Sequence, residues 1–405
     1  MNEVKLQKGR ERSVLRRHPW IFSGAIQGGG LETGLASACR RDGDGTGLGE
    51  VVAVKSAKGE MLGYGWLSPA SQIRVRMLSF DAKAVPDEAF LRARLAQAID
   101  ARRYDFVGAE ARRLVNAEND GLPGVVADAY AGFVVLQLTS AFGAANRELI
   151  VAALVAAGAK GVSERSDVEV RAKEGLPVGG FAHLAGEEPP ETITIEENGV
   201  KFLIDVRKGH KTGYYLDQRE ARRLVGAYAT GEVLNCFSYT GGFGLYAAKG
   251  GARSVLQVDV SAEALRRAEE NRVLNNIPDG VIATEEADVF KFLRTCRDAG
   301  RQFDTIILDP PKFAESKAQV MKAARGYKDI NLFAMKLLRP GGILATFSCS
   351  SAMTSDLFDK VVAEAAADAK RDFQILARTL QADDHPVSMH FPEGQYLKGL
   401  ILRAK

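Results

Sequence analysis

The sequence is organised around the segment Leu234-Asn235-Cys236-Phe237-Ser238-Tyr239-Thr240-Gly241-Gly242-Phe243-Gly244. Its start predicts a buried strand, and its glycines predict a loop that opens a helix. Glycines at such a turn let the backbone approach a ligand and leave the N–H groups of the helix available to it. The spacing is Gly-Gly-x-Gly, which differs from the dinucleotide fingerprint. We therefore expect a strand, a ligand-binding loop and a helix in that order.

Strands and helices alternate regularly after this segment. The pattern predicts an α/β fold with a parallel, doubly wound sheet. A hairpin is expected before it, at 192–196 and 200–206, because Asn198-Gly199 is the strongest short-range hairpin signal. Two antiparallel edge strands are expected after it, at 373–380 and 396–402. The expected strands between them are 233–235, 254–258, 281–284, 305–308 and 343–347. One helix is expected to start at residue 244, and four others are expected at 262–275, 289–296, 327–338 and 355–370.

Aspartates follow three of the expected strands. Asp259 closes the second strand and is placed to bond a ribose diol, Asp288 follows the third and is placed to bond an adenine amino group, and Asp309 ends the fourth. For each of them a helix cap is the alternative, because Asp at a strand end often has that role. Together with the glycine loop they predict a nucleoside cofactor. One glycine loop without a phosphate-binding lysine favours S-adenosylmethionine over ATP.

Cys349 is the candidate nucleophile. It lies in Phe347-Ser348-Cys349-Ser350-Ser351, after the apolar run 343–347, and that run follows an expected turn at Arg339-Pro340-Gly341-Gly342. A thiol where a buried strand surfaces can be reached by a ligand, because α/β folds place their chemistry at strand ends. The alternative is a small apolar filler, since free cysteine is among the most buried residue types.

The chain before residue 191 has a different pattern. Glycines and short apolar runs at 48–54, 61–67 and 73–78 predict a small β-barrel, with Arg74 and Arg76 on one face of a strand. A helix is expected from Pro86-Asp87-Glu88. Strands at 114–116, 124–127 and 133–138, a helix at 146–157, an extended segment at 162–170 and a boundary loop from Pro177 to Pro190 follow. The predicted domains are 1–81, 82–190 and 191–405.

Composition supports a globular protein that works in the cytoplasm. The 405 residues are 46% hydrophobic and 26% charged. Residues 1–20 lack the pattern of a secretory signal, and the most apolar stretch, 149–157, is about half of a membrane-spanning helix. The four cysteines are far apart and form no Cys-x-x-Cys pair, so the sequence supports neither a zinc site nor a disulfide framework. We expect no metal and no membrane partner.

Positive charge is clustered although the net charge is only +3. Residues 1–17 carry six cations against two acids, a local charge of +4, and residues 207–223 have the same balance. Such patches favour polyanions, because each phosphate contact releases counterions. An ordinary solvated face is the alternative.

Several motifs resemble those of a known family. Tyr239-Thr240-Gly241-Gly242-Phe243, Asp309-Pro310-Pro311-Lys312-Phe313 and Ser348-Cys349-Ser350 look like the cofactor and catalytic motifs of class I S-adenosylmethionine-dependent RNA methyltransferases. More narrowly, the segments 8–10 and 18–22, Gly209 to Arg219, and Phe391-Pro392-Glu393-Gly394 resemble the bacterial 23S ribosomal RNA large subunit methyltransferase I family, which are cytosine-5 enzymes. The likeness spans the whole chain.

This resemblance implies three domains, one cofactor and one substrate. Residues 1–81 are expected to form an RNA-binding PUA domain, 82–190 a small strand-strand-helix-strand-strand domain, and 191–405 a hairpin with a Rossmann-like methyltransferase domain. The cofactor is S-adenosylmethionine and the partner is 23S ribosomal RNA, with a homodimer left open. The expected cofactor-binding residues are Gln218, Phe237, Tyr239, Thr240, Gly241, Gly242, Asp259 and Asp288, and the expected catalytic residues are Cys349 and Asp309.

The chemistry explains why a cysteine is needed. Carbon 5 of cytosine becomes nucleophilic enough only after a thiolate adds to carbon 6. Asp309 is expected to bond the N3 and amino edge of the base, and cofactor binding is its alternative role. For Gln218, the alternative to cofactor binding is a position on the surface at the start of a helix. Another cytosine-5 group has a second cysteine where this chain has Pro311-Lys312, so the acceptor of the carbon 5 proton stays open. The other readings are a base methylation that needs no cysteine, such as guanine-N7, and a non-catalytic RNA-binding assembly factor.

Overall fold

The computed structural model describes residues 1–30, 48–102, 110–314 and 316–405. Cys39 therefore lies outside the described residues. The predicted domain boundaries at 81/82 and 190/191 stay predictions. The described chain forms two compact units: unit 1 comprises Met1–Ile193, Ile204–Tyr214 and Asp384–Gly394, and unit 2 comprises Thr194–Leu203, Tyr215–Asp383 and Gln395–Lys405.

Unit 1 begins with a five-stranded sheet in the order β1-β3-β4-β5-β2. Val4, Val52 and Val75 belong to its apolar core. Arg76 is buried and forms ion pairs with Glu174 and Glu118, so this arginine stabilises the fold. The strands are β1 (Glu3–Lys5), β2 (Trp20–Ile21), β3 (Glu50–Lys55), β4 (Met61–Leu67) and β5 (Val75–Ser79), with the short helix α1 (Arg12–Leu15) between the first two.

A second five-stranded sheet in unit 1 has the order β10-β9-β8-β7-β6. The predicted extended segment 162–170 is wrong beyond Arg165, because a 3-10 helix follows at Glu169–Glu174. The predicted boundary loop also contains a strand, β10 (Phe181–Gly186), whose half-exposed edge position gives no apolar run in the sequence. The other elements are α3 (Glu88–Asp100), β6 (Ala111–Asn116), β7 (Val125–Tyr130), β8 (Phe133–Leu138), α4 (Ala141–Ala145), α5 (Arg147–Ala156) and β9 (Gly161–Arg165).

The predicted hairpin is confirmed as β11 (Ile193–Glu197) and β12 (Val200–Ile204). Asn198 and Gly199 have φ of 49° and 76°, the left-handed pair that a tight two-residue hairpin turn requires. In unit 2, the Leu203 backbone N–H donates to Asn271 Oδ1 at 2.8 Å. The hairpin is therefore tied to α8 (Ala262–Leu274) by hydrogen bonds.

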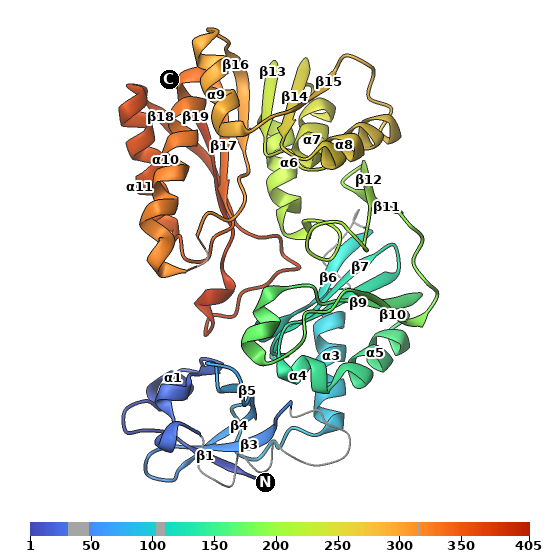
Figure 1. The fold of residues 1–405 in the computed structure, drawn as a ribbon, viewed down its shortest axis with the longest axis vertical. Helices are drawn as coiled ribbons and strands as arrows, with labels where there is room; N and C mark the ends of the chain where they lie inside the picture. Colours follow the sequence, from blue (N-terminus) through green and yellow to red (C-terminus); the bar gives the residue numbers. More distant parts are fainter. Residues whose placement is uncertain (31–47, 103–109, 315) are drawn as a thin grey trace. The chain divides into compact units, whose positions relative to one another are not determined.

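Unit 2 contains the predicted α/β sheet, with seven strands in the order β15-β14-β13-β16-β17-β19-β18. β13 to β17 pair in parallel, and β19 is antiparallel to both β17 and β18, as predicted for the edge. Figure 1 shows α9, α10 and α11 on one face of this sheet and α6, α7 and α8 on the other. The strands are β13 (Glu232–Cys236), β14 (Ser254–Asp259), β15 (Ile282–Glu286), β16 (Phe303–Leu308), β17 (Leu338–Ser348), β18 (Phe373–Thr379) and β19 (Lys398–Ala404).

Two predicted boundaries in unit 2 are wrong. The expected turn at 339–342 lies inside β17, where the register jumps from Leu338 opposite Phe303 to Ile343 opposite Thr305. The helix expected from residue 327 starts at Val320, because its first turns pack small alanines into the core and these give a weak apolar signal. The helices are α6 (Arg219–Tyr228), α7 (Gly242–Lys249), α9 (Val289–Asp298), α10 (Val320–Leu337) and α11 (Ser355–Ala369).

The strand order reverses next to β13, which lies between β14 and β16. In open α/β sheets, ligands bind outside the carboxyl ends of the strands at such a reversal. The loops after Cys236 and Leu308 therefore mark the expected crevice. None of the helices that the structure describes is long and apolar enough to span a membrane.

Candidate active site

The glycine loop after β13 has an unusual backbone. Phe237 and Tyr239 have φ of 58° and 48°, a left-handed conformation that is costly for side-chain-bearing residues. Such strain concentrates at functional sites. Gly241 has φ of 85°, and a Cβ atom there would lie 2.8 Å from the Gln257 side chain. Gly241 is therefore required by packing as well as by the turn, and Gly242 is the first residue of α7.

Asp259 supports this loop from the end of β14. Its Oδ2 accepts a hydrogen bond from the Tyr239 backbone N–H at 2.8 Å, and its Oδ1 accepts one from Ser261 N–H at 3.0 Å. The Thr240 carbonyl accepts a hydrogen bond from the Asn271 amide at 3.1 Å. These bonds fix the loop conformation.

Asp288 caps a helix, which was the alternative role predicted for it. It is the N-cap of α9, where its side chain accepts a hydrogen bond from Lys291 N–H at 2.9 Å. The same side chain is exposed at the end of β15. A contact with an adenine group stays a prediction, because a cap uses only one lone pair of the carboxylate.

Asp309 and Gln218 lie together. Asp309 follows β16, and the Gln218 amide Nε2 lies 2.8 Å from each of its two carboxylate oxygens. Gln218 is buried at the start of α6, and within the described residues its Oε1 has no hydrogen-bond partner. The amide therefore orients Asp309 and leaves one buried acceptor for a ligand donor.

The loop around Cys349 is fixed by the serines on either side. Ser348 Oγ donates to the Tyr327 hydroxyl at 2.9 Å, and Ser350 Oγ donates to the Ala314 carbonyl at 2.6 Å. Both serines are fully buried, whereas Cys349 is partly exposed. The second bond ties the cysteine loop to the loop that carries the Asp-Pro-Pro-Lys-Phe motif.

Lys398, which the sequence analysis did not name, lies against the loop that carries Cys349. Its side chain is 6% exposed, and Nζ donates to the Ser350 and Met353 carbonyls, both at 2.6 Å. The available signal was a lysine within the apolar segment 396–402 that the sequence predicted as a strand. Burial lowers the pKa of Lys398 to about 8, although its interaction with Cys349 acts in the opposite direction.

Two tyrosines connect Asp309 with Cys349. Burial, and then the negative charges of Asp309 and Cys349 among others, raise the pKa of Tyr215. Burial raises the pKa of Tyr327, and Cys349 and Asp309 raise it further, against the hydrogen bond from Ser348. Both phenols are therefore protonated at neutral pH, and neither phenolate is available as a base.

The other described cysteines have different surroundings. Cys236 in β13 and Cys296 in α9 are buried in the apolar core. Burial raises the pKa of both thiols. Because a thiolate is the reactive form, these two cysteines are inert packing residues.

The residues of the glycine loop fit a nucleoside-bearing cofactor. The strained loop at 237–239 opens directly onto the first turn of α7, where backbone N–H groups point outward. Within the described part of the chain, Ser238 Oγ and Gln218 Oε1 are buried and have no hydrogen-bond partner. Buried polar atoms are normally satisfied, so two such atoms next to one loop indicate a ligand that supplies partners.

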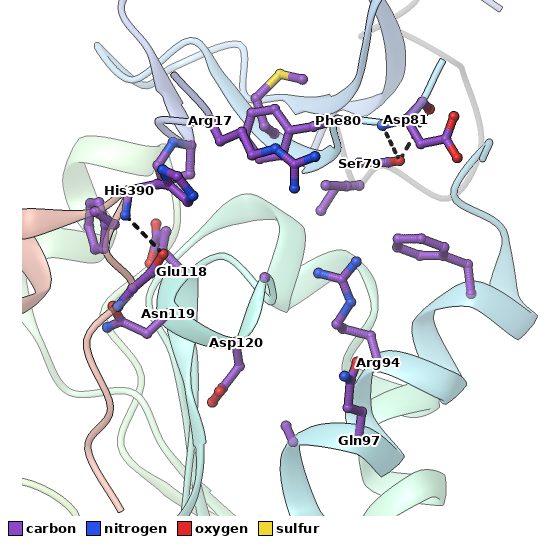
Figure 2. A pocket seen from close by; sticks show the side chains of 18 of the residues that line it. Arg17, Ser79, Phe80, Asp81, Arg94, Gln97, Glu118, Asn119, Asp120 and His390 are labelled. Carbon is purple, nitrogen blue, oxygen red and sulfur yellow. Dashed lines mark hydrogen bonds between the residues drawn. The ribbon is translucent and has the colours of Figure 1, made fainter. Parts of the chain in front are cut away.

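The two basic clusters have different surroundings. In the second cluster, Arg222 is buried and forms a two-point ion pair with Glu197 at 2.8 and 2.7 Å, so it stabilises the fold. In the first cluster, Arg17 is exposed and lines a cavity of about 570 Å³ in unit 1. Figure 2 shows the Arg17 and Arg94 side chains reaching into this cavity from different elements.

The two terminal motifs of the resemblance lie together in unit 1. His18 Nε2 lies 3.1 Å from Glu393 Oε2, and the Trp20 and Phe391 rings meet edge to face at 4.7 Å. His18 thus has a structural role in unit 1.

Family models match both parts of the chain. A model for S-adenosylmethionine-dependent methyltransferases matches residues 143–386, and a model for PUA-like domains matches residues 4–80. The predicted PUA fold, methyltransferase sheet and cofactor are therefore confirmed.

Relatives match over nearly the full length. Ribosomal RNA large subunit methyltransferase I of Shewanella frigidimarina (strain NCIMB 400) is 52% identical over 406 residues, which cover 99% of this chain and 98% of the relative. The protein of the same name from Aeromonas salmonicida (strain A449) is 49% identical, with 99% of both chains covered.

Solved structures share the fold. A putative methyltransferase, SMU.776, complexed with SAH, is 25% identical with a TM-score of 0.82, and all of both chains is covered. A putative methyltransferase from Streptococcus mutans has the same TM-score and coverage at 24% identity, which supports the fold alone.

Proposed function

The chain belongs to the ribosomal RNA large subunit methyltransferase I family, and from this premise we propose that it transfers a methyl group from S-adenosylmethionine to carbon 5 of a cytosine in 23S ribosomal RNA. The observation that carries the proposal is the placement of Cys349. The thiol is partly exposed between two anchored serines, and it shares Tyr215 and Tyr327 with Asp309 as neighbours. Asp309 follows β16 and Cys349 follows β17, and because these two strands are parallel neighbours, both residues lie at the same end of the sheet.

Cys349 acts as the nucleophile in this proposal. Its thiolate adds to carbon 6, so that a sulfur–carbon bond forms and the electrons of the 5,6 double bond make carbon 5 nucleophilic. After methyl transfer, the carbon 5 proton leaves and the sulfur–carbon bond breaks, which restores the double bond and the thiolate. The bonds from Ser348 and Ser350 hold the thiol in place through both steps.

Asp309 stabilises the base during the addition. Addition at carbon 6 places negative charge on N3, which takes up a proton from water, and a fixed carboxylate then accepts hydrogen bonds from the N3–H and the amino group. The Gln218 amide, 2.8 Å from both carboxylate oxygens, keeps Asp309 in one orientation. Gln218 is thus proposed as a positioning residue as well as a cofactor contact.

The cofactor pocket is proposed to be the set of residues around the glycine loop. S-adenosylmethionine supplies an electrophilic methyl group when it is bound. The loop from Phe237 to Gly242 gives backbone contacts, Asp259 and Asp288 are placed at the two following strand ends, and Tyr239 and Thr240 shape the wall. The Asp259 hydrogen bond to the Tyr239 N–H holds this wall in place.

Unit 1 is proposed to bind the RNA backbone. Arg17 and Arg94 both line the cavity shown in Figure 2. Three acids also line this cavity: Glu118 accepts from the Trp20 indole, Asp120 pairs with Arg102 and also acts on Arg94, and Asp81 accepts from the Lys83 N–H. Arg17, which is exposed, is the main cation proposed to bind a phosphodiester here, with Arg94 beside it.

The substrate must present an unstacked cytosine. A base inside a stacked helix cannot bring carbon 6 to a thiol, so the enzyme has to act on RNA in which the base can turn outward. We therefore propose 23S ribosomal RNA that proteins have not yet fully packed.

One experiment tests the proposal directly. Purified protein, S-adenosylmethionine and unmodified 23S ribosomal RNA are incubated, and 5-methylcytosine is mapped by bisulfite sequencing and mass spectrometry. We expect one new 5-methylcytosine with the native protein and none with Cys349→Ala, which should still bind S-adenosylmethionine in calorimetry. Ser351→Ala, an exposed neighbour, is the control and should methylate normally.

Two outcomes contradict the proposal. Undiminished transfer by Cys349→Ala excludes the covalent mechanism and favours a base position that needs no thiol, such as guanine-N7. A native protein that binds the RNA and leaves it unmethylated favours an assembly factor.

A further inference from the structure

We propose that Lys398 is the positive partner that holds Cys349 as a thiolate. The inference rests on the proposed function of Cys349 and adds a residue to it. A thiol is only a few per cent ionised at neutral pH without help, so a cysteine that must attack carbon 6 needs a nearby cation or a proton acceptor.

The surroundings of Lys398 are unusual for a lysine. Its side chain is almost fully buried, and its two hydrogen-bond acceptors are the neutral carbonyls of Ser350 and Met353. Among the described residues, the ion pairs found in the structure do not include Lys398. A buried ammonium without an opposite charge is strongly disfavoured. An anion is therefore missing from this site.

Cys349 is in the position to supply that anion. Lys398 is the first residue of β19 and is paired in register with Ser348, the last residue of β17. Its two carbonyl acceptors belong to the residues that follow Cys349 in the same loop. The ammonium is therefore held at the base of the cysteine loop, and it interacts electrostatically with Cys349.

Three other described side chains in the surroundings of Cys349 carry no positive charge. Tyr215 and Tyr327 are protonated phenols at neutral pH, and Asp309, which acts on the same two tyrosines, is a carboxylate. Asp309 disfavours a second negative charge nearby. The positive charge of Lys398 thus offsets the repulsion that the Asp309 carboxylate exerts on a thiolate. When the thiol ionises, the S–H proton leaves to water and its electron pair stays on sulfur.

The pH range follows from the direction of the lysine shift. The pKa of Lys398 is lowered to about 8, so the ammonium is present at neutral pH and is lost as the pH rises through that value. Thiolate formation favours the ammonium in return, because the two opposite charges stabilise each other. The pair is therefore expected at neutral pH.

The test measures the thiol directly. The rate of iodoacetamide modification of Cys349 is followed against pH by mass spectrometry of its peptide, in the native protein, Lys398→Met and Lys398→Gln. Loss of an adjacent cation raises a thiol pKa by roughly 1 to 3 units. We expect the pH midpoint of Cys349 alkylation to rise by at least about one unit in both variants, which lowers the alkylation rate at pH 7 about tenfold.

The variants separate charge from structure. Lys398→Gln keeps a donor for the carbonyls without the charge, Lys398→Arg keeps the charge and should retain a low midpoint, and Lys360→Met, at an exposed lysine of α11, should match the native protein. Circular dichroism confirms that each variant is folded. An unchanged midpoint in folded Lys398→Gln overturns the inference.

The readout does not depend on methyl transfer. If Cys349→Ala keeps full activity, the covalent mechanism fails whatever the alkylation midpoints show. If Cys349→Ala is inactive and the midpoints do not move, the mechanism stands and the role of Lys398 fails.

Discussion

Arg222 and Lys398 are both buried cations of unit 2, and they differ in what faces them. Arg222 is paired with the Glu197 carboxylate through two hydrogen bonds beneath the hairpin. Lys398 faces two carbonyls and a cysteine. A complete buried pair has its charge balanced within the fold and serves structure. A buried cation that faces only neutral groups keeps a charge that a reaction can use. We therefore expect the charge of the facing group to separate a structural cation from a functional one.

The largest effect is expected when the complete pair is broken. Arg222→Met should lower the free energy of unfolding by about 3–5 kcal/mol, because it leaves the Glu197 carboxylate buried without its cation. Urea unfolding followed by circular dichroism measures it. Arg223→Met, at the neighbouring exposed pair with Glu220, is the matched control and should change stability by less than about 1 kcal/mol.

The same comparison predicts a smaller stability loss at Lys398. Lys398→Met removes the cation without leaving a buried carboxylate, so about 1–3 kcal/mol is expected for the two carbonyls that lose a donor. A loss equal to that of Arg222→Met would show that Lys398 is a structural cation of the same kind.

The next effect concerns the orientation of Asp309. Gln218→Leu should lower kcat about 10- to 100-fold, because the carboxylate loses the amide that fixes it while the fold keeps its core. Single-turnover methylation of 23S ribosomal RNA measures the loss. Gln374→Leu, at an exposed position of β18, should have no effect, and an unchanged rate for Gln218→Leu would remove Gln218 from the site.

A moderate effect is expected at the loop anchor. Ser350→Ala deletes the hydrogen bond to the Ala314 carbonyl and should cost about 1–2 kcal/mol of stability. It should also slow methyl transfer, since Cys349 is the preceding residue. Ser351→Ala is the control for placing an alanine in this loop. Equal losses of stability and methyl-transfer rate in both variants would contradict the anchoring role of Ser350.

The smallest effect is expected at the two arginines that line the cavity of unit 1. Arg17→Gln and Arg94→Gln should each weaken RNA binding a few-fold and reduce the slope of log affinity against log salt by about 0.7–0.9. Filter binding at several salt concentrations measures both. Arg16→Gln and Arg92→Gln change neighbouring arginines that do not line the cavity, and they should affect binding less.

The sequence predicted elements whose signals are local. The Asn198-Gly199 turn, the glycine loop and the alternating strands of unit 2 were correct because turn chemistry and apolar runs are read over a few residues. The strand at 181–186 was missed, since it pairs at a half-exposed edge and carries no apolar run. The register jump in β17 depends on its neighbour β16, which the sequence of β17 alone does not contain.

The candidate site was predicted by residue type and only in part by contact. Cys349 and Asp309 were named as candidates because each ends an apolar strand, and their roles stay predictions. Lys398 was not named because its contact with the Cys349 loop comes from pairing β19 with β17, two strands far apart in the sequence. The Gln218 bond to Asp309 was missed for the same reason, since 91 positions separate the two residues.

Unit 1 includes the late segment Asp384–Gly394. The Asp384 carboxylate accepts a hydrogen bond from Arg113 N–H at 2.9 Å, and the Pro386 carbonyl accepts one from the Asn116 amide at 2.9 Å. On the ribosome, which makes the chain from its N-terminus, these acceptors appear only after almost all of unit 2 has been synthesised. The unit whose synthesis begins first therefore stays incomplete until residues 384–394 have been made, and until then the Trp20 ring lacks its contact with Phe391.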